Sequence, residues 1–396
     1  MCPRQAREQE NLTSSAFKTN LVTLLSFRVG RLAGFQIAIH YSWLLIFGLI
    51  LLILSTGYMP LNYPGLSTIA YWIIGLIATV LLFASVLFHE LCHSIVARRY
   101  GLPITRITLF FFGGVSEMAE EPQDPRVELK MAAAGPASSI LLAVAFGLAA
   151  FVGSNTRMPS EVVAPLEYGF WINAFLAGFN LLPGFPMDGG RILRSAIWIW
   201  KRDIVRATRT ATSIGVGLAY LMIAGGFILS FAGLWANGLW LVFIGLFIKS
   251  GAESSLKHTI INKALLGIAI GNIMTTDIKT VQPDTTVEEF IAEYLLKYRH
   301  EVYPVVSDGQ ILGLASIQDA KQIPKPQWSA TAVKSIMRPT EKIVMARPDQ
   351  EAVEALIKMS KYDVGQVLVV SEGKLMGIVT HSDIFQVVKA RTELSL

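Results

Sequence analysis

Charged residues are scarce in this chain of 396 residues, since Asp, Glu, Lys and Arg make up only 16% of it, whereas 53% is hydrophobic. A soluble domain carries about 25% charged residues. With a mean hydropathy of +0.49, the composition therefore indicates an integral membrane protein. Cysteine is also scarce: Cys2 and Cys92 are the only two, which excludes a disulfide framework. Residues 1–20 lack the apolar stretch of a signal peptide.

The long uncharged runs lie between residues 38 and 250, and six of them are long enough to suggest helices in a lipid bilayer. We predict a cytosolic tail at 1–34, a membrane domain at 35–250, a linker at 251–269 and a soluble domain after it. The predicted spans are 38–58, 69–97, 130–153, 165–183, 211–232 and 235–249.

The net charge of +5 does not indicate a nucleic-acid partner, because Lys and Arg occupy short segments between apolar runs, as orientation signals do. The opposite loops near 59–68 and 233–236 have none, and the loop near 154–164 has only Arg157. The positive-inside rule therefore places both termini in the cytosol. The basic residues on that side are Arg4, Arg7, Lys18, Arg28, Arg31, Arg98, Arg99, Arg106, Arg191, Arg194, Lys201, Arg202, Arg206, Arg209, Lys249, Lys257 and Lys263.

A His-Glu-x-x-His motif at residues 89–93 lies near the end of the second apolar run, where titratable groups are costly. On a helix, the spacing of four places His89 and His93 on one face, where they can bind one metal ion. Glu90 lies beside them and can act as general base toward a water molecule. The motif alone is moderately specific, and its other interpretation is a pair of hydrogen-bonded core histidines.

A third ligand is available in the run from Asn180 to Gly190, which ends the fourth span among prolines and glycines. Pro183 and Pro186 stop the helix, and the glycines permit a close turn that can aim Asp188 inward. A role as helix terminator alone would explain the prolines but not the acid.

The charge pattern places these segments at the same depth. His93 precedes Arg98 by five residues, about 7.5 Å along a helix, and Asp188 precedes Arg191 by three. Both should lie near the cytosolic ends of their spans. We therefore predict one tetrahedral zinc held by His89, His93 and Asp188, with a water molecule in the fourth position.

The chemistry expected of this group is peptide hydrolysis. Glu90 would take a proton from the attacking water and pass it to the leaving amine. Asn180 is the candidate donor to the oxyanion. Asn173, seven residues earlier on the same helical face, can do similar work, but an interhelical hydrogen bond is its expected role.

Between the second and third spans, residues 104–116 are rich in strand formers and too short to span as a helix. Irregular backbone at membrane depth needs protein or a water-filled cavity around it. We expect a hairpin or re-entrant strand near the active site. Its free edge can pair with an unwound substrate, or the hairpin only packs at the interface.

Residues 35–250 resemble the site-2 protease family of intramembrane zinc metalloproteases, through the motif at 89–93 and the Asn-x-x-Pro-x-x-Pro-x-Asp-Gly pattern at 180–189. The resemblance implies that His89, His93 and Asp188 bind zinc, that Glu90 is the catalytic base and that Asn180 contacts substrate or transition state. It also implies cleavage of single-span membrane proteins, in a prokaryotic cell membrane by expectation.

The Gly135-Pro136 pair resembles the family's Gly-Pro segment at the start of the third span. Many relatives carry an Asn shortly afterwards, where this chain has Ser138 and Ser139. No role is transferred to those two serines.

An internal repeat with a period of about 63 residues occupies residues 264–396. Ile273-Met274-Thr275 matches Ile336-Met337-Arg338, and Gly313–Asp319 matches Gly377–Asp383. In each copy a helix-like segment precedes two strand-like ones. Two such copies can bury one another's apolar faces, which favours a paired α/β module at 270–326 and 333–393.

This module resembles a tandem pair of cystathionine-beta-synthase (CBS) domains, which in several families bind adenine nucleotides. The Thr/Ser-x-x-Asp signature, implied by the resemblance to contact ribose, occurs as Ser316 with Asp319 and as Thr380 with Asp383. ATP, ADP or AMP is therefore a candidate ligand that would change how the module packs against the protease. Such pairs also serve as dimerisation modules, so a homo-oligomer is a second expectation.

The fold expected is thus a polytopic α-helical membrane protein with a short β hairpin and a soluble CBS pair. The function expected is regulated intramembrane proteolysis. Two alternatives stay open at this point: a proteolytically inactive membrane scaffold, and a transporter or channel with a nucleotide-sensing tail. Neither needs Glu90 between two histidines at helical spacing.

Overall fold

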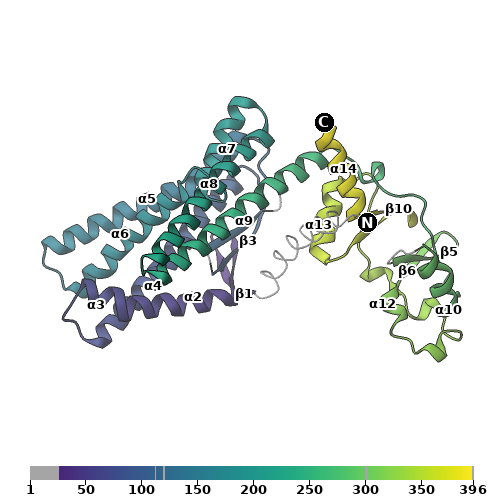
Figure 1. The fold of residues 1–396 in the computed structure, drawn as a ribbon, viewed down its shortest axis with the longest axis horizontal. Coiled ribbons are helices and arrows are strands. Elements are labelled where there is room, and N and C mark those ends of the chain that lie inside the picture. Colours follow the sequence, from purple (N-terminus) through teal and green to yellow (C-terminus); the bar gives the residue numbers. More distant parts are fainter. Residues whose placement is uncertain (1–25, 112, 119–120, 299–301, 395–396) are drawn as a thin grey trace. The chain divides into compact units, whose positions relative to one another are not determined.

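The computed structural model describes residues 26–111, 113–118, 121–298 and 302–394, and it divides into two compact units, one ending at Thr259 and one beginning at Ile260 (Figure 1). The first unit contains the six predicted apolar spans as helices. They are α2–α3 (Tyr41–Ile53 and Met59–Asn62, joined by a wider turn into one span), α4 (Thr68–Arg99), α5 (Pro125–Asn155), α6 (Ser160–Asn180), α8 (Ile204–Phe231) and α9 (Trp235–Leu265).

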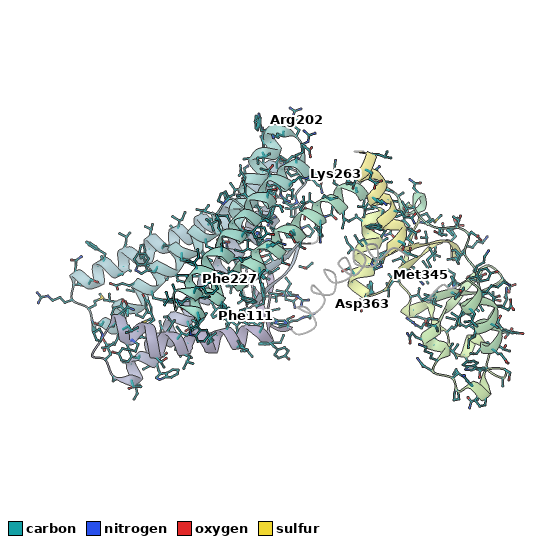
Figure 2. All side chains as sticks on the ribbon, viewed as in Figure 1. Phe111, Arg202, Phe227, Lys263, Met345 and Asp363 are labelled. Carbon is teal, nitrogen blue, oxygen red and sulfur yellow. The ribbon has the colours of Figure 1, made fainter. Side chains whose placement is uncertain are left out.

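The ends of these helices follow from local chemistry. The Ser67 and Asp124 side chains accept hydrogen bonds from backbone N–H groups in the first turns of α4 and α5. Arg98 and Arg99 end α4, where cations stabilise the helix dipole. On α8, Leu221, Phe227 (labelled in Figure 2) and Ile228 are each more than half exposed, as expected of a lipid-facing surface.

A four-stranded sheet accompanies the helices, in the order β1 (Ser26–Leu32), β2 (Phe35–His40), β3 (Ile104–Phe110) and β4 (Gly113–Met118). The strands β3 and β4 form the predicted hairpin, and β2 pairs with β3 in parallel. Residues 26–34 differ from the predicted N-terminal tail, because they form β1 and its turn. The charges of Arg28 and Arg31 on this exposed strand concealed its pattern.

Two further boundaries differ from the prediction. The helix α9 continues to Leu265 through residues assigned to the linker, because Ser, Glu and Lys extend a helix beyond the apolar run. An amphipathic helix, α7 (Asp188–Lys201), follows the proline-rich turn. At its start, a Cβ on Gly189 would lie 2.3 Å from the carbonyl oxygen of Leu181, so only glycine permits this close fold.

The second unit confirms the internal repeat, since each half has its own apolar core and ends in a strand pair followed by a helix. Its sheet has the order β5-β6-β10-β9-β8, with β7 on β6. The elements are α10 (Val287–Glu289), α11 (Leu296–Tyr298), β5 (Val302–Ser307), β6 (Gln310–Ser316), α12 (Ile317–Ala320), β7 (Arg338–Pro339), β8 (Met345–Ala346), α13 (Ala352–Tyr362), β9 (Gln366–Ser371), β10 (Lys374–Thr380) and α14 (His381–Leu394).

Candidate metal centre

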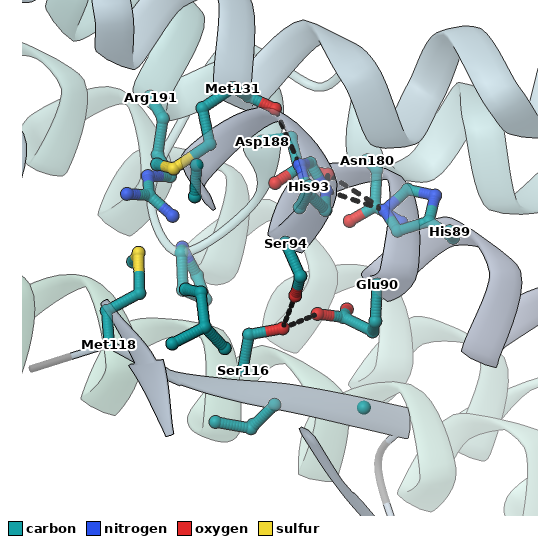
Figure 3. A pocket seen from close by; sticks show the side chains of 15 residues that line it. His89, Glu90, His93, Ser94, Ser116, Met118, Met131, Asn180, Asp188 and Arg191 are labelled. Carbon is teal, nitrogen blue, oxygen red and sulfur yellow. Dashed lines mark hydrogen bonds and ion pairs between the residues drawn. The ribbon is translucent and has the colours of Figure 1, made fainter. Parts of the chain in front are cut away.

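The three predicted ligands converge although Asp188 is almost a hundred residues from the histidines in sequence. His89 and His93 face it from α4, while Asp188 is the first residue of α7 (Figure 3). The Nε2 atoms lie 3.0 Å (His89) and 3.1 Å (His93) from Oδ2 of Asp188, and 3.1 Å from each other. The three ligand atoms thus form one compact triangle.

The donor set fits zinc. The Nδ1 atom of His93 lies 2.7 Å from the carbonyl oxygen of Met131, which can only accept, so Nδ1 carries the proton and Nε2 of the neutral ring is a bare acceptor. A metal cation between this bare nitrogen and the carboxylate of Asp188 would satisfy both atoms. A tetrahedral zinc with bonds of about 2.0–2.1 Å has edges of about 3.3 Å, so small shifts would accommodate it.

Gly135 on α5 makes room for this group. A Cβ at residue 135 would lie 2.1 Å from Nε2 of His93 and 2.6 Å from Nε2 of His89. The Gly-Pro pair noted in the sequence thus lies against both imidazoles, a role that the spacing along the chain did not reveal.

Glu90 lies beside the triangle and is held by Ser116, which in turn contacts Ser94. The Ser116 hydroxyl on β4 donates to Oε2 of Glu90 at 3.1 Å, and the Ser94 and Ser116 hydroxyl oxygens are 3.0 Å apart (Figure 3). A Cβ on Gly114 would lie 2.4 Å from Cγ of Glu90, so this strand approaches the base closely. Sequence reasoning missed these residues; only the β-prone pattern at 104–116 hinted at them.

The two asparagines have different positions. Asn180 lines the same cavity as the triangle, and its amide donates to its own helix, to the carbonyl oxygen of Leu176 at 3.0 Å. Asn173 is fully buried and donates to Ser85 Oγ on α4 at 2.9 Å. The expected interhelical hydrogen bond of Asn173 is therefore confirmed.

The cavity has a volume of about 290 Å³ and extends along α4 from His89 to Ala97, close to the basic end of that helix. The lining residues are His89, Glu90, His93, Ser94, Ala97, Ile104, Gly114, Val115, Ser116, Met118, Met131, Asn180, Pro186, Asp188 and Arg191.

A buried ion pair anchors the helix that carries Asp188. Glu128 on α5 is 0% exposed and Arg194 on α7 is 4% exposed; the guanidinium donates to both carboxylate oxygens, with Nε 2.9 Å from Oε1. Nearby, Glu121 accepts a hydrogen bond from His258 at 3.2 Å, which lowers the pKa of this carboxyl despite its burial. Arg194 also lies over the ring of Phe185.

The two predicted nucleotide signatures lie in the second unit and differ from each other. In both, the hydroxyl and the carboxylate bond to each other and to the helix start, as Ser316 with Asp319 and Thr380 with Asp383. Arg338 donates to Ser316 Oγ at 3.1 Å and to Asp319 at 3.4 Å. The repeat-equivalent residue, Thr275, is neutral and donates to Asp383.

The class defined by this fold and site is a membrane-embedded zinc metalloprotease with an appended repeat domain. The model of peptidase family M50 matches residues 77–159 and 147–224, and the CBS domain model matches 270–323 and 333–390. Rip3 of Mycobacterium tuberculosis is 35% identical over 362 residues, covering 91% of this chain and 92% of Rip3. Zinc metalloprotease MJ0392 of Methanocaldococcus jannaschii is 33% identical, covering 91% of this chain and 95% of MJ0392.

A solved structure, the site-2 protease from M. jannaschii, is 31% identical and covers 58% of this chain and 95% of that chain, with a TM-score of 0.40. From the extent of the sequence matches, the chain belongs to the M50 family of zinc metalloproteases, the site-2 protease family, and carries two CBS domains. It is an integral membrane enzyme.

Proposed function

We propose that this enzyme is an intramembrane endopeptidase that cuts single-span, membrane-tethered proteins near the cytosolic side, in regulated intramembrane proteolysis. The observation that carries the proposal is the cavity itself. It places His89, Glu90 and His93 on a helix apolar enough to cross a membrane, together with Asp188. A soluble protease has no need of six such helices around its catalytic group.

The residues divide the reaction between them. His89, His93 and Asp188 would hold the metal, and the chemistry supplied by a bound zinc ion is polarisation of the scissile carbonyl and activation of water. Glu90 takes a proton from the attacking water and returns it to the leaving amine. Asn180 donates to the oxyanion once its amide turns from its own helix toward the cavity.

The substrate would enter as an extended segment along β4. Within the described residues, this strand pairs with β3 on one side and ends the sheet order, so its other edge is available to a further strand. Gly114 and Ser116 of β4 line the cavity, which brings a paired substrate next to Glu90. A hairpin that only packs at the membrane interface would not need an edge strand next to Glu90.

The orientation proposed has both termini and the CBS pair in the cytosol of a prokaryotic cell. Its support is the asymmetry of basic loops and the extension of the cavity toward the basic end of α4, where Arg98 and Arg99 lie. Water, which the hydrolysis consumes, would arrive from that side.

Modulation by an adenine nucleotide is the second part of the proposal. The half-site of Thr380 and Asp383 is the better candidate, because its neighbour Thr275 is small and neutral. The buried amide nitrogen of Gln366, which pairs with Thr380 across the strands, has no hydrogen-bond partner among the described residues. In the other half-site, the Arg338 guanidinium already donates hydrogen bonds to the Ser316 hydroxyl and the Asp319 carboxylate.

The test compares membranes of cells that express the wild type with those that express Glu90→Gln. Protein N-termini are identified by mass spectrometry. The expected result is a set of new N-termini inside apolar spans with the wild type alone, at equal zinc content in both proteins. Asp188→Ala should instead lose the zinc. Identical N-termini in both membranes, or a folded wild type that takes up no zinc when supplied, would overturn the proposal.

A further inference from the structure

One helix face of α5 carries three features that bear on the histidines. Met131, Gly135 and Ser139 follow one another at intervals of four, so they lie in one stripe. The Met131 carbonyl faces His93, Gly135 leaves space for both rings, and Ser139 Oγ lies 2.9 Å from Nδ1 of His89. The helix α5 thus supplies a partner for each imidazole.

The Met131 carbonyl and the Ser139 hydroxyl differ in how far they determine which ring nitrogen carries the proton. The carbonyl of Met131 can only accept, so it fixes the proton of His93 on Nδ1. A serine hydroxyl can donate or accept. Whether Nδ1 of His89 carries the proton therefore depends on whether the Ser139 hydroxyl accepts or donates in this contact. A metal at Nε2 requires the proton on Nδ1, with Ser139 as acceptor.

The Ser139 hydroxyl is buried against His89. Ser139 is 0% exposed, and His89 is the hydrogen-bond partner of its hydroxyl among the described residues. The adjacent Ser138, also buried, behaves like an ordinary helical serine and donates to the carbonyl oxygen of Gly135. Two neighbouring serines therefore provide a matched pair, one facing the ligand and one facing the backbone.

We propose that Ser139 is a positioning residue for the metal site: its oxygen accepts the Nδ1 proton of His89 and so directs Nε2 of His89 toward the ion. This inference rests on the proposed zinc site of His89, His93 and Asp188. Partners of this kind orient the ring and raise its basicity, and their loss typically weakens metal binding by about 10- to 100-fold.

The experiment measures zinc affinity of the full-length protein in detergent, by competition with a fluorescent chelator, and needs no substrate. Ser139→Ala should weaken binding by about 10- to 100-fold, and Ser139→Thr, which keeps the hydroxyl, should restore most of it. Ser138→Ala is the control and should bind as the wild type does. The metal-free forms of all four proteins should unfold at similar temperatures, which a merely structural role of Ser139 would not allow.

Wild-type affinity in a folded Ser139→Ala protein would overturn the inference while leaving the zinc site standing. A wild type that binds no zinc would instead overturn the proposed function. If Ser139→Ala does not fold, Ser139→Cys keeps the volume and offers only a weak acceptor, so it should show the same loss; undiminished affinity in Ser139→Cys would then count against the role.

Discussion

Gly135 shows how one missing side chain shapes the metal site. Gly135→Ala should abolish zinc binding, because the new Cβ would lie 2.1 Å from Nε2 of His93, closer than any relaxed contact permits. The matched control is Gly178→Ala on α6, where the added atom would meet no neighbouring element of the described chain within 4 Å. Zinc content measured by mass spectrometry should fall in the first variant alone. Normal zinc in Gly135→Ala would mean that the histidines bind metal elsewhere.

Ser116 offers a second test, directed at the base rather than the metal. Ser116→Ala should lower kcat about 10-fold at unchanged zinc content and KM, since a hydrogen bond to a charged carboxylate is worth about 1.5 kcal/mol or more. Ser116→Thr should recover most of the rate. The measurement follows the release of a fragment that the wild type produces and Glu90→Gln does not.

The control for the half-buried Ser116 is Ser195→Ala on α7, a buried serine whose hydroxyl donates to the carbonyl oxygen of Arg191 within its own helix. It should leave kcat unchanged. Equal rates in Ser116→Ala and the wild type would show that Glu90 is oriented without this strand.

Local patterns predicted the three residues that meet at the candidate metal centre, but not the residues that contact them. The spacing of His89 and His93 is visible in five consecutive residues, and Asp188 stands in a run of prolines and glycines. Ser116 and Ser139, in contrast, meet their partners across 26 and 50 residues, and nothing in their own neighbourhood marks them. Contacts between distant segments depend on packing that no short motif records.

Helices and strands show the same difference between local patterns and contacts with distant segments. Apolar length revealed the six spans, because a bilayer demands a minimum run of apolar residues. The strand β1 and the helix α7 escaped prediction, since β1 is charged and exposed and two glycines directly follow the first residue of α7. Both are stabilised by neighbouring elements rather than by their own sequences.

The attachment of α7 to α5 can be tested through its buried ion pair. Arg194→Met should destabilise the membrane unit by roughly 3 kcal/mol, because the fully buried carboxylate of Glu128 then keeps only the more distant Arg191, whose Nε lies 3.6 Å from Oε1. The double variant with Glu128→Leu should recover much of this loss. Thermal unfolding in detergent measures both.

The control for that pair is Arg206→Met. The Arg206 side chain is 79% exposed and pairs with Asp203 at the surface, so its loss should cost less than about 1 kcal/mol. Equal stabilities of Arg194→Met and Arg206→Met would mean that the buried pair does not anchor α7.

Acid should weaken the repeat unit through His381. Burial lowers the pKa of this imidazole below its usual value, although a backbone hydrogen bond with Gly365 opposes the shift. The unfolded chain therefore binds the proton more readily, so the unit should lose stability as the pH falls below about 6.5, the unfolded value. Pulse proteolysis in urea, reading fragments of residues 266–394, should show this pH dependence reduced in His381→Gln. An unchanged pH dependence would assign it to other groups.

The whole molecule combines two units with separate cores, so a change in one half-site of the CBS pair should leave the zinc content of the other unit unchanged. The difference between the two half-sites predicts how many nucleotides bind. We expect calorimetry of the full-length protein to show one ATP per chain. Binding should be lost in Asp383→Ala and retained in Asp319→Ala, because the Asp319 carboxylate already pairs with Arg338. Arg338→Ala, which frees Ser316 and Asp319, should allow a second nucleotide to bind. Loss of binding in Asp319→Ala with retention in Asp383→Ala would reverse the assignment, and absence of binding to the wild type would leave the pair as an assembly module.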